Sequence, residues 1–308
     1  MKLPEFATIC EVGPRDGLQN EKKILTTEER LSLVKGAIES GFRVVEVGSF
    51  VHPKAVPQMA NTDEIFRELG EVKGVELRAL IANMKGVERA AACGCRKVKL
   101  NVSASLGHNM ANLNCTPEES VARFKDMVNA AHDAGIEASG SISMAFGSPW
   151  DDLILLSQVK KITEAYLEAG VTEISLSDAS GQAFPKQVSG YCEEMGREYP
   201  EVKWWLHFHN TRGLAMANIL AGLEAGFTRF DASFAGVGGC PFVPGATGNV
   251  ATEDVIHMLD GIGVETGVDI GKCVANARHL REIIGHETDS YILKAGRAGD
   301  LKLDLPVK

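Results

Sequence analysis

Short runs of apolar and β-branched residues alternate along the chain with longer segments in which apolar residues recur at helical spacing. Eight of the short runs have the length and composition of buried strands. They cover residues 8–12, 43–47, 77–81, 97–102, 137–143, 173–177, 204–209 and 229–232. Strands separated by helix-length segments are typical of βαβ units around a parallel sheet.

The segments between these runs predict helices. They cover residues 27–40, 84–93, 117–134, 153–169, 186–198, 215–225 and 252–259. Several are followed by a glycine and an apolar residue, as in the segments 40–42, 134–136, 169–171 and 225–227. A glycine directly after a helix is a C-terminal capping signal, so each of these helices is expected to end where the next strand opens.

The number and order of these units favour a closed (β/α)8 TIM barrel. A TIM barrel typically needs about 250 residues, so a chain of 308 residues fits one barrel with a short C-terminal helical extension. No linker or low-complexity tract divides the chain, and we therefore expect a single catalytic domain over residues 1–308. An open doubly wound sheet is the competing architecture, but no G-x-G-x-x-G sequence follows the first strand.

Polar residues gather where the predicted strands end, which is where a TIM barrel carries its active site. Arg15 and Asp16 follow the first strand, and Glu46 ends the second. Asp178 follows the sixth strand, and a His-x-His sequence ends the seventh. We expect these side chains to meet at the carboxyl end of the barrel.

His207 and His209 are the strongest single signal for chemistry. Residues i and i+2 of a strand point to the same face, so both imidazoles should enter the barrel. Two hydrogen-bonded core histidines are the structural alternative, but a metal ion would better offset the cost of burying two imidazoles. Asp16 could supply an oxygen ligand, or it could be a turn residue in Pro-Arg-Asp-Gly. A mixed nitrogen and oxygen site suits Mg²⁺ or Mn²⁺.

Two further features bear on the chemistry. Residues 236–249 are rich in glycine and proline, which predicts a loop over the barrel mouth, and Cys240 within it is either an acid/base thiol or an incidental cysteine. Arg15 could stabilise an enolate or carboxylate oxygen with its fixed, charged donors. It could instead form a salt bridge to Glu46 or Asp178.

Composition narrows the partners. The net charge of −9 gives no basic field for nucleic acid or an anionic membrane surface, and no window is long and apolar enough for a membrane span. The seven cysteines are an odd number spread through the chain, which indicates free thiols in a reducing compartment. We expect a cytoplasmic protein that binds neither nucleic acid nor membrane.

Four longer segments stand out in the chain: EVGPRDGLQNE, SFVHPKAVPQM, LHFHNTRGLAMAN and GVGGCPFVPGATGNVATED. They resemble the 3-hydroxy-3-methylglutaryl-coenzyme A (HMG-CoA) lyase family, which belongs to the aldolase-like TIM-barrel metallolyases. The resemblance runs from about residue 8 to residue 280. It implies cleavage of HMG-CoA to acetoacetate and acetyl-CoA with Mg²⁺ or Mn²⁺, an acyl-CoA substrate and a homodimer.

The resemblance also implies roles for individual residues. The implied metal ligands are Asp16, His207, His209 and Asn249. Arg15 would polarise the thioester carbonyl and stabilise the enolate, and Cys240 would take part in proton transfer. Glu46 and Asp178 match positions near the reacting hydroxyl. The matching positions on the substrate or CoA side are Gln19, Lys22, Ser49 and Ser175.

Several positions depart from the family pattern. Leu106 stands where an acidic residue is usual, and Ala179 stands in a segment that usually reads G-D-T-I-G. Asn210 and Ser148 also replace the more common Asp and Cys. A related 3-hydroxy-acyl-CoA is therefore the main alternative substrate. A Claisen-type synthase of the same superfamily and a non-catalytic metal-binding barrel compete with the lyase as functions.

Overall fold

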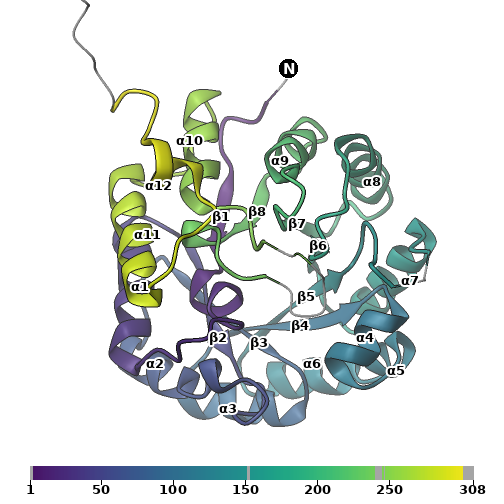
Figure 1. Ribbon diagram of the computed structural model, residues 1–308. Helices are drawn as coiled ribbons and strands as arrows, with labels where there is room; N and C mark the ends of the chain where they lie inside the picture. The colour runs from purple at the N-terminus through teal and green to yellow at the C-terminus, as the bar shows by residue number, and fades with distance from the viewer. Residues whose placement is uncertain (1–2, 151–152, 240–244, 246, 301–308) are drawn as a thin grey trace, which may run out of the picture.

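Eight parallel strands close into a barrel in sequence order, as the computed structural model of the chain shows (Figure 1). The structure describes residues 3–150, 153–239, 245 and 247–300. The strands are β1 (Thr8–Glu11), β2 (Val44–Ser49), β3 (Glu76–Ile81), β4 (Lys97–Ser103), β5 (Glu137–Ser143), β6 (Glu173–Asp178), β7 (Lys203–Phe208) and β8 (Arg229–Ala232). The pairing of β1 with β8 closes the sheet, with Cys10 opposite Asp231. The predicted TIM barrel is confirmed.

Helices form an outer ring around the strands (Figure 1). They are α1 (Thr27–Glu39), α2 (Thr62–Leu69), α3 (Met84–Cys93), α4 (Leu106–Leu113), α5 (Pro117–Val121), α6 (Phe124–Asp133), α7 (Leu156–Glu168), α8 (Pro185–Glu198), α9 (Ala215–Glu224), α10 (Thr252–Gly261), α11 (Ile270–Ile284) and α12 (Tyr291–Ala295). Helix α11 packs against α1 and α10, and with α12 it forms the predicted C-terminal extension.

Helix ends follow the glycine signals in the sequence. The glycines at positions 41, 135, 170 and 226 all have positive φ, between 71° and 97°. Only glycine adopts this left-handed region without strain, so each one turns the chain out of a helix and toward the next strand. At the other end of α1, the Thr26 hydroxyl accepts from the Glu29 N–H, and the Glu29 carboxylate accepts from the Thr26 N–H in a capping box.

The two faces of the strands are chemically different. Outward-facing side chains such as Val98, Leu100 and Phe208 pack against the helices and form the main hydrophobic core. Inside the barrel, a small apolar cluster is made by Cys10, Val12, Val44 and Trp205. Much of the remaining interior is charged and paired. Because an unpaired buried charge is costly, this interior depends on ion pairs.

The charged interior is layered along the barrel axis. In the layer nearer the amino ends of the strands, Lys97 contacts Glu173 and Glu137, each at 3.1 Å, and Arg78 contacts Glu173 at 2.8 Å. The next layer toward the carboxyl ends contains Lys99, two positions further along β4.

No helix among the described residues is long and apolar enough to cross a bilayer.

Candidate metal centre and active-site cavity

Asp16, His207 and His209 come together at the carboxyl end of the barrel. One ligand atom from each lies within 4.8 Å of the others. Oδ2 of Asp16 is 3.9 Å from Nε2 of His207 and 3.7 Å from Nε2 of His209. Both imidazoles therefore present the same nitrogen to one carboxylate oxygen, as the His-x-His spacing predicts.

Local structure explains how these three residues meet. His207 lies in β7, and His209 follows the strand and forms an isolated bridge with Asn249. Asp16 lies in a π-helical turn, η1 (Gly13–Gly17), which follows β1 directly. The N–H groups of Asp16 and Gly17 donate to the carbonyl of Val12, so the turn is fixed to the end of its strand.

Asn249 completes the cluster through its amide. Its Nδ2 donates to Oδ2 of Asp16 at 2.7 Å and to the carbonyls of Val237 and Gly238 at 3.1 and 3.2 Å. Its Oδ1 is buried and has no hydrogen-bond partner among the described residues. A buried acceptor without a donor is costly, and a cation would satisfy it. The four residues that the resemblance implies as ligands thus fit a divalent cation with mixed nitrogen and oxygen donors.

Gly238 lets the loop after β8 approach this cluster. Its φ is 102°, and a Cβ there would lie 2.6 Å from the carbonyl oxygen of Asp16 and 2.7 Å from Nδ2 of Asn249. No side chain fits in that space. The glycine-rich sequence therefore serves a close backbone approach at this position.

Arg15 is buried beside the cluster. Its Nε donates to Glu46, and its Nη1 donates to Oδ1 of Asp16. The salt bridge from Arg15 to Glu46 is confirmed. Burial raises the pKa of Asp16, but the Arg15 guanidinium and the two imidazoles outweigh burial and hold that pKa well below its usual range. Asp16 is therefore a carboxylate at neutral pH.

Two further buried residues extend the cluster, and the sequence patterns did not single them out. Oδ2 of Asp231 lies 3.2 Å from Nδ1 of His207, and Lys99 Nζ lies 3.0 Å from the same oxygen. Lys99 Nζ also lies 3.2 Å from Oε2 of Glu46. A usable signal was present, since Lys99 and Asp231 occupy inward positions of predicted strands, where a charge needs a partner.

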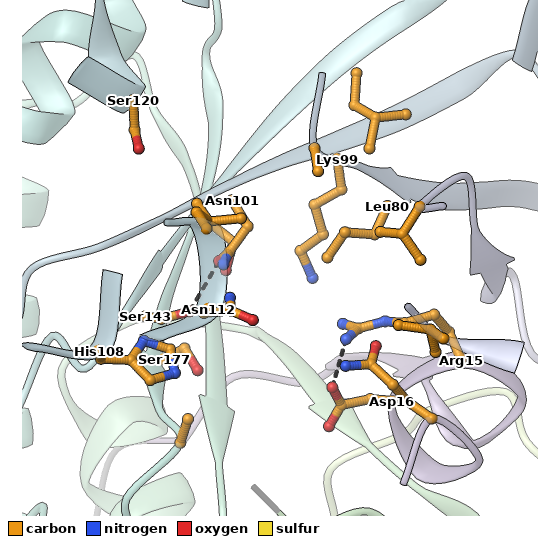
Figure 2. A pocket seen from close by; sticks show the side chains of 18 of the residues that line it. Arg15, Asp16, Leu80, Lys99, Asn101, His108, Asn112, Ser120, Ser143 and Ser177 are labelled. Atoms are coloured by element: carbon orange, nitrogen blue, oxygen red, sulfur yellow. Dashed lines mark hydrogen bonds and ion pairs between the residues drawn. The ribbon is translucent and has the colours of Figure 1, made fainter. Parts of the chain in front are cut away.

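A cavity of about 390 Å³ opens in front of the cluster. Arg15, Asp16, His207 and His209 line one side of it, and Gln19 also lines it. Figure 2 shows Asn101, Ser143 and Ser177 on the far side, facing Arg15 and Asp16 across the cavity. The charged groups around Asp16 thus face a group of uncharged hydrogen-bonding side chains, Asn101, Ser143 and Ser177, across the cavity.

Asp178 is not brought into the cavity. It lies on the outward face of β6, and its carboxylate accepts from the N–H groups of Gln182 and Ala183, each at 2.9 Å. Burial raises its pKa. The alternation of the strand explains the placement, because Ser177 takes the inward position and lines the cavity. Among the described residues, the ion pairs of Arg15 are with Asp16 and Glu46 rather than with Asp178, and the place of Asp178 near a reacting hydroxyl stays a prediction from the resemblance.

The remaining predicted site residues are Ser49, Ser175, Lys22 and Cys240, and they differ in where they lie relative to the cavity. Ser49 and Ser175 are buried. Within the described ranges, their hydroxyl groups have no hydrogen-bond partner and neither residue lines the cavity. Lys22 is exposed outside the cavity lining. Cys240 lies outside the described residues.

The closed barrel, with a three-ligand cluster and a guanidinium at its carboxyl rim, defines the class of TIM-barrel enzymes with a candidate metal centre. The HMGL-like family matches residues 7–279. The chain belongs to this family.

Characterised relatives and solved structures agree with this assignment. The hydroxymethylglutaryl-CoA lyase of Pseudomonas mevalonii is 42% identical over 85% of this chain and 87% of its own length. The mitochondrial hydroxymethylglutaryl-CoA lyase of Arabidopsis thaliana is 40% identical over 94% of this chain, which spans 62% of that protein. An HMG-CoA lyase from Acinetobacter baumannii, solved with coenzyme A and 3-methylmalate, superimposes with a TM-score of 0.93 at 38% identity, covering 98% of both chains.

Proposed function

We propose that this protein cleaves HMG-CoA to acetoacetate and acetyl-CoA, with Mg²⁺ or Mn²⁺ held by Asp16, His207, His209 and Asn249. The observation that carries the proposal is the juxtaposition of this ligand cluster with Arg15 at the cavity wall. Membership of the HMGL-like family supports the same reaction. The acyl-CoA is the substrate, and the cation is the only cofactor proposed.

The reaction is a retro-Claisen cleavage. The proton of the tertiary hydroxyl is removed, the C3 oxygen becomes the ketone of acetoacetate, and the C2–C3 bond breaks. The bonding electrons pass to the thioester as an enolate, which is then protonated at C2 to give acetyl-CoA. A cation bound at the cluster would lower the pKa of the hydroxyl and orient it.

Arg15 meets the charge that develops on the thioester oxygen. Burial lowers the pKa of Arg15, but the carboxylates of Asp16 and Glu46 raise that pKa by more than burial lowers it. The guanidinium therefore remains charged. Its Nε is held by Glu46, which fixes the plane of the group toward the cavity. A preorganised cation of this kind stabilises an enolate without reorganisation during the reaction. We assign Glu46 the role of holding Arg15, and Cys240 a part in proton transfer, which rests on the family resemblance.

The side chains of Asn101, Ser143 and Ser177 suit the acyl end of the substrate. Asn101 accepts from the Ser143 hydroxyl at 2.8 Å, which leaves its amide N–H groups available to a ligand. Ser177 lines the same wall. A carboxylate would accept hydrogen bonds there.

One observation favours the second candidate, a related 3-hydroxy-acyl-CoA with a different C3 substituent. Ala179, one of the departures from the family pattern, lines the cavity. Its methyl side chain leaves more space than the threonine that is usual there. Leu106, the other main departure, is 52% exposed and is not among the described lining residues.

Product analysis tests the proposal. The purified protein is treated with a chelator, given Mg²⁺ or Mn²⁺, and incubated with HMG-CoA and with 3-hydroxy-acyl-CoA esters that differ only at C3. We expect acetyl-CoA and acetoacetate in equal amounts from HMG-CoA, and only with the cation. Faster turnover of another ester would select the second candidate, and no turnover of any ester would reject the lyase.

We further propose a cytoplasmic homodimer with a single catalytic domain over residues 1–308. Free buried cysteines such as Cys10, Cys192 and Cys273 support a reducing compartment. The homodimer rests on the family resemblance, and light scattering of the purified protein would test it.

A further inference from the structure

We propose that Lys99 is a positioning residue that ties the guanidinium of Arg15 to the metal-binding imidazole of His207. The inference rests on the proposed metal site, because the arrangement it explains is the orientation of one of its ligands. It assigns a role to an interior lysine and to Asp231, neither of which belongs to the ligand set.

The contacts of Lys99 reach both sides of the site. Its Nζ lies 3.2 Å from Oε2 of Glu46 and 3.0 Å from Oδ2 of Asp231. Oε1 of Glu46 accepts from Nε of Arg15. Oδ2 of Asp231 lies 3.2 Å from Nδ1 of His207. One ammonium group therefore connects the two halves of the site through one carboxylate on each side.

The barrel geometry makes this connection possible. Glu46 comes from β2, Lys99 from β4 and Asp231 from β8, so a long side chain must cross the interior to reach both carboxylates. Figure 2 shows the Lys99 side chain extending from its strand toward the side of the cavity occupied by Arg15. Lysine has the length and the three donors that this position needs.

Charge balance explains why a cation is required there. Lys99 is 3% exposed, Asp231 is 2% exposed and Glu46 is fully buried. The ammonium group of Lys99 lies between the two buried carboxylates and stabilises both of them. Without it, the two negative charges would repel each other with no water to screen them. Burial lowers the pKa of Lys99, but Asp231 and Glu46 raise it above its usual value, so Lys99 remains charged and is unsuited to act as a base.

The Asp231 contact sets the tautomer of His207. A carboxylate at Nδ1 favours the proton on that nitrogen, which leaves the lone pair of Nε2 directed toward Asp16. Metal-binding histidines commonly donate their second ring N–H to a carboxylate, and loss of that partner typically weakens metal affinity or activity by about 10- to 100-fold. Lys99 in turn fixes Asp231, whose other oxygen has no hydrogen-bond partner in the described part of the chain.

The test compares Lys99→Met with Lys97→Met. Lys97 is a matched control because it lies on the same face of the same strand, is buried, and pairs with Glu137 and Glu173, away from the cluster. Mn²⁺ affinity is measured by electron paramagnetic resonance of the chelator-treated protein, and kcat and KM are measured separately. We expect Lys99→Met to weaken Mn²⁺ binding by about 10- to 100-fold and to lower kcat. Lys97→Met should lower stability but leave Mn²⁺ affinity within about threefold of the wild type, well short of the change expected for an outer-shell partner.

Variants of the two carboxylates separate the halves of the connection. Asp231→Asn should weaken Mn²⁺ binding, whereas Glu46→Gln should lower kcat with Mn²⁺ affinity unchanged. If Lys99→Met does not fold, the charge-balanced variant Lys99→Met/Glu46→Gln takes its place and should bind Mn²⁺ more weakly than Glu46→Gln alone. Wild-type Mn²⁺ affinity in the folded Lys99→Met or in this double variant would overturn the inference.

The outcome is separable from that of the proposed reaction. A wild-type protein that binds Mn²⁺ but does not cleave HMG-CoA contradicts the proposed reaction, while the Mn²⁺ measurements on the variants still decide the role of Lys99. A wild-type protein that binds no Mn²⁺ contradicts the metal site and overturns this inference with it.

Discussion

Asp16 uses its two carboxylate oxygens for different sets of partners. Oδ1 accepts from Arg15, and Oδ2 faces the Nε2 atoms of His207 and His209 and accepts from Asn249. The ion pair and the ligand role therefore use different atoms of one side chain. This division explains how adjacent residues of a five-residue turn can serve the enolate side and the cation side of the cavity together.

At the residue scale, the first prediction concerns Arg15. Arg15→Gln should lower kcat by about 10²- to 10³-fold, because a charged donor to the developing enolate is lost. Mn²⁺ affinity should change little, since Asp16 keeps Oδ2 for the cation. Steady-state kinetics and Mn²⁺ titration would measure the two effects, with the exposed Arg197→Gln on α8 as a control. A kcat within a few-fold of the wild type would contradict the assigned role.

The site residues differed in how far the sequence could place them. The His-x-His pair and Asp16 follow from strand alternation and barrel topology, which act locally. Asn249 required the family resemblance, because its approach depends on a loop bridge to His209. Ser175 and Asp178 were expected near the same substrate, but residues three apart in one strand face opposite sides, so both could not point inward.

At the element scale, the loop after β8 and the turn η1 form one packed unit. The carboxyl group of Glu11 accepts from the N–H groups of Gly13 at 2.7 Å and Phe234 at 2.9 Å, and its other oxygen lies 2.6 Å from the Thr252 hydroxyl. Gly238 then lies against Asp16 and Asn249. A substitution in the loop should therefore alter the positions of the metal ligands.

We predict that Gly238→Ala weakens Mn²⁺ binding and activity. Its φ of 102° and the 2.6 Å approach to the Asp16 carbonyl leave no room for a methyl group. Gly263→Ala is the matched control, since that residue also has positive φ, 77°, but no atom of the described residues lies within 4 Å of the position that a Cβ would take. The control should cost about 1–2 kcal/mol of stability and leave Mn²⁺ affinity unchanged. Equal Mn²⁺ affinities in both variants would refute the packing argument.

Strands were easier to predict than helices. The runs 137–143 and 229–232 coincide with β5 and β8, and each begins two or three residues after a glycine that ends the preceding helix, Gly135 or Gly226. The predicted helix 117–134 is divided into α5 and α6. Helices α2 and α4 were missed because each has eight residues and lies within a polar βα connection, where periodicity is too short to detect.

At the scale of the whole molecule, the barrel and its C-terminal extension bury the carboxyl groups of Glu11 and Glu253, whose pKa values are set mainly by burial. Burial raises the pKa of Glu11 from 4.5 to about 8 and that of Glu253 from 4.5 to about 7. Between the ordinary pKa of 4.5 and the raised pKa values, the folded state therefore binds more protons than the unfolded state. Stability contributed by the protonated groups is present below about pH 4.5 and is lost as the pH rises through about 7 to 8.

Glu11→Gln should flatten this pH dependence. The amide keeps an acceptor for the N–H groups of Gly13 and Phe234, can donate to Thr252, and has no proton to lose. Each unit of pKa difference corresponds to about 1.4 kcal/mol, so the variant should gain stability relative to the wild type at pH 8 but not at pH 5. Urea unfolding at both pH values checks this. If the free energy of unfolding changed by the same amount from pH 5 to pH 8 in the wild type and in the variant, that result would count against a buried protonated carboxyl group at Glu11.

Fold and interior charge also differ in how visible they are from sequence. The barrel follows from repeated strand and helix signals along the chain. The pairing of Lys99 with Glu46 and Asp231 joins three strands that are far apart in sequence, and only the closed sheet determines which inward positions share a layer. Sequence alternation marks such residues as inward but does not identify their partners.

The most direct test of metal-dependent cleavage is Mn²⁺ binding and HMG-CoA turnover in His207→Ala beside the wild type. We predict one Mn²⁺ per wild-type chain, with cleavage that requires it, and loss of both Mn²⁺ binding and acetyl-CoA release in a folded His207→Ala variant. Retention of cleavage by that variant would contradict the assignment of this cluster as the metal centre of the enzyme.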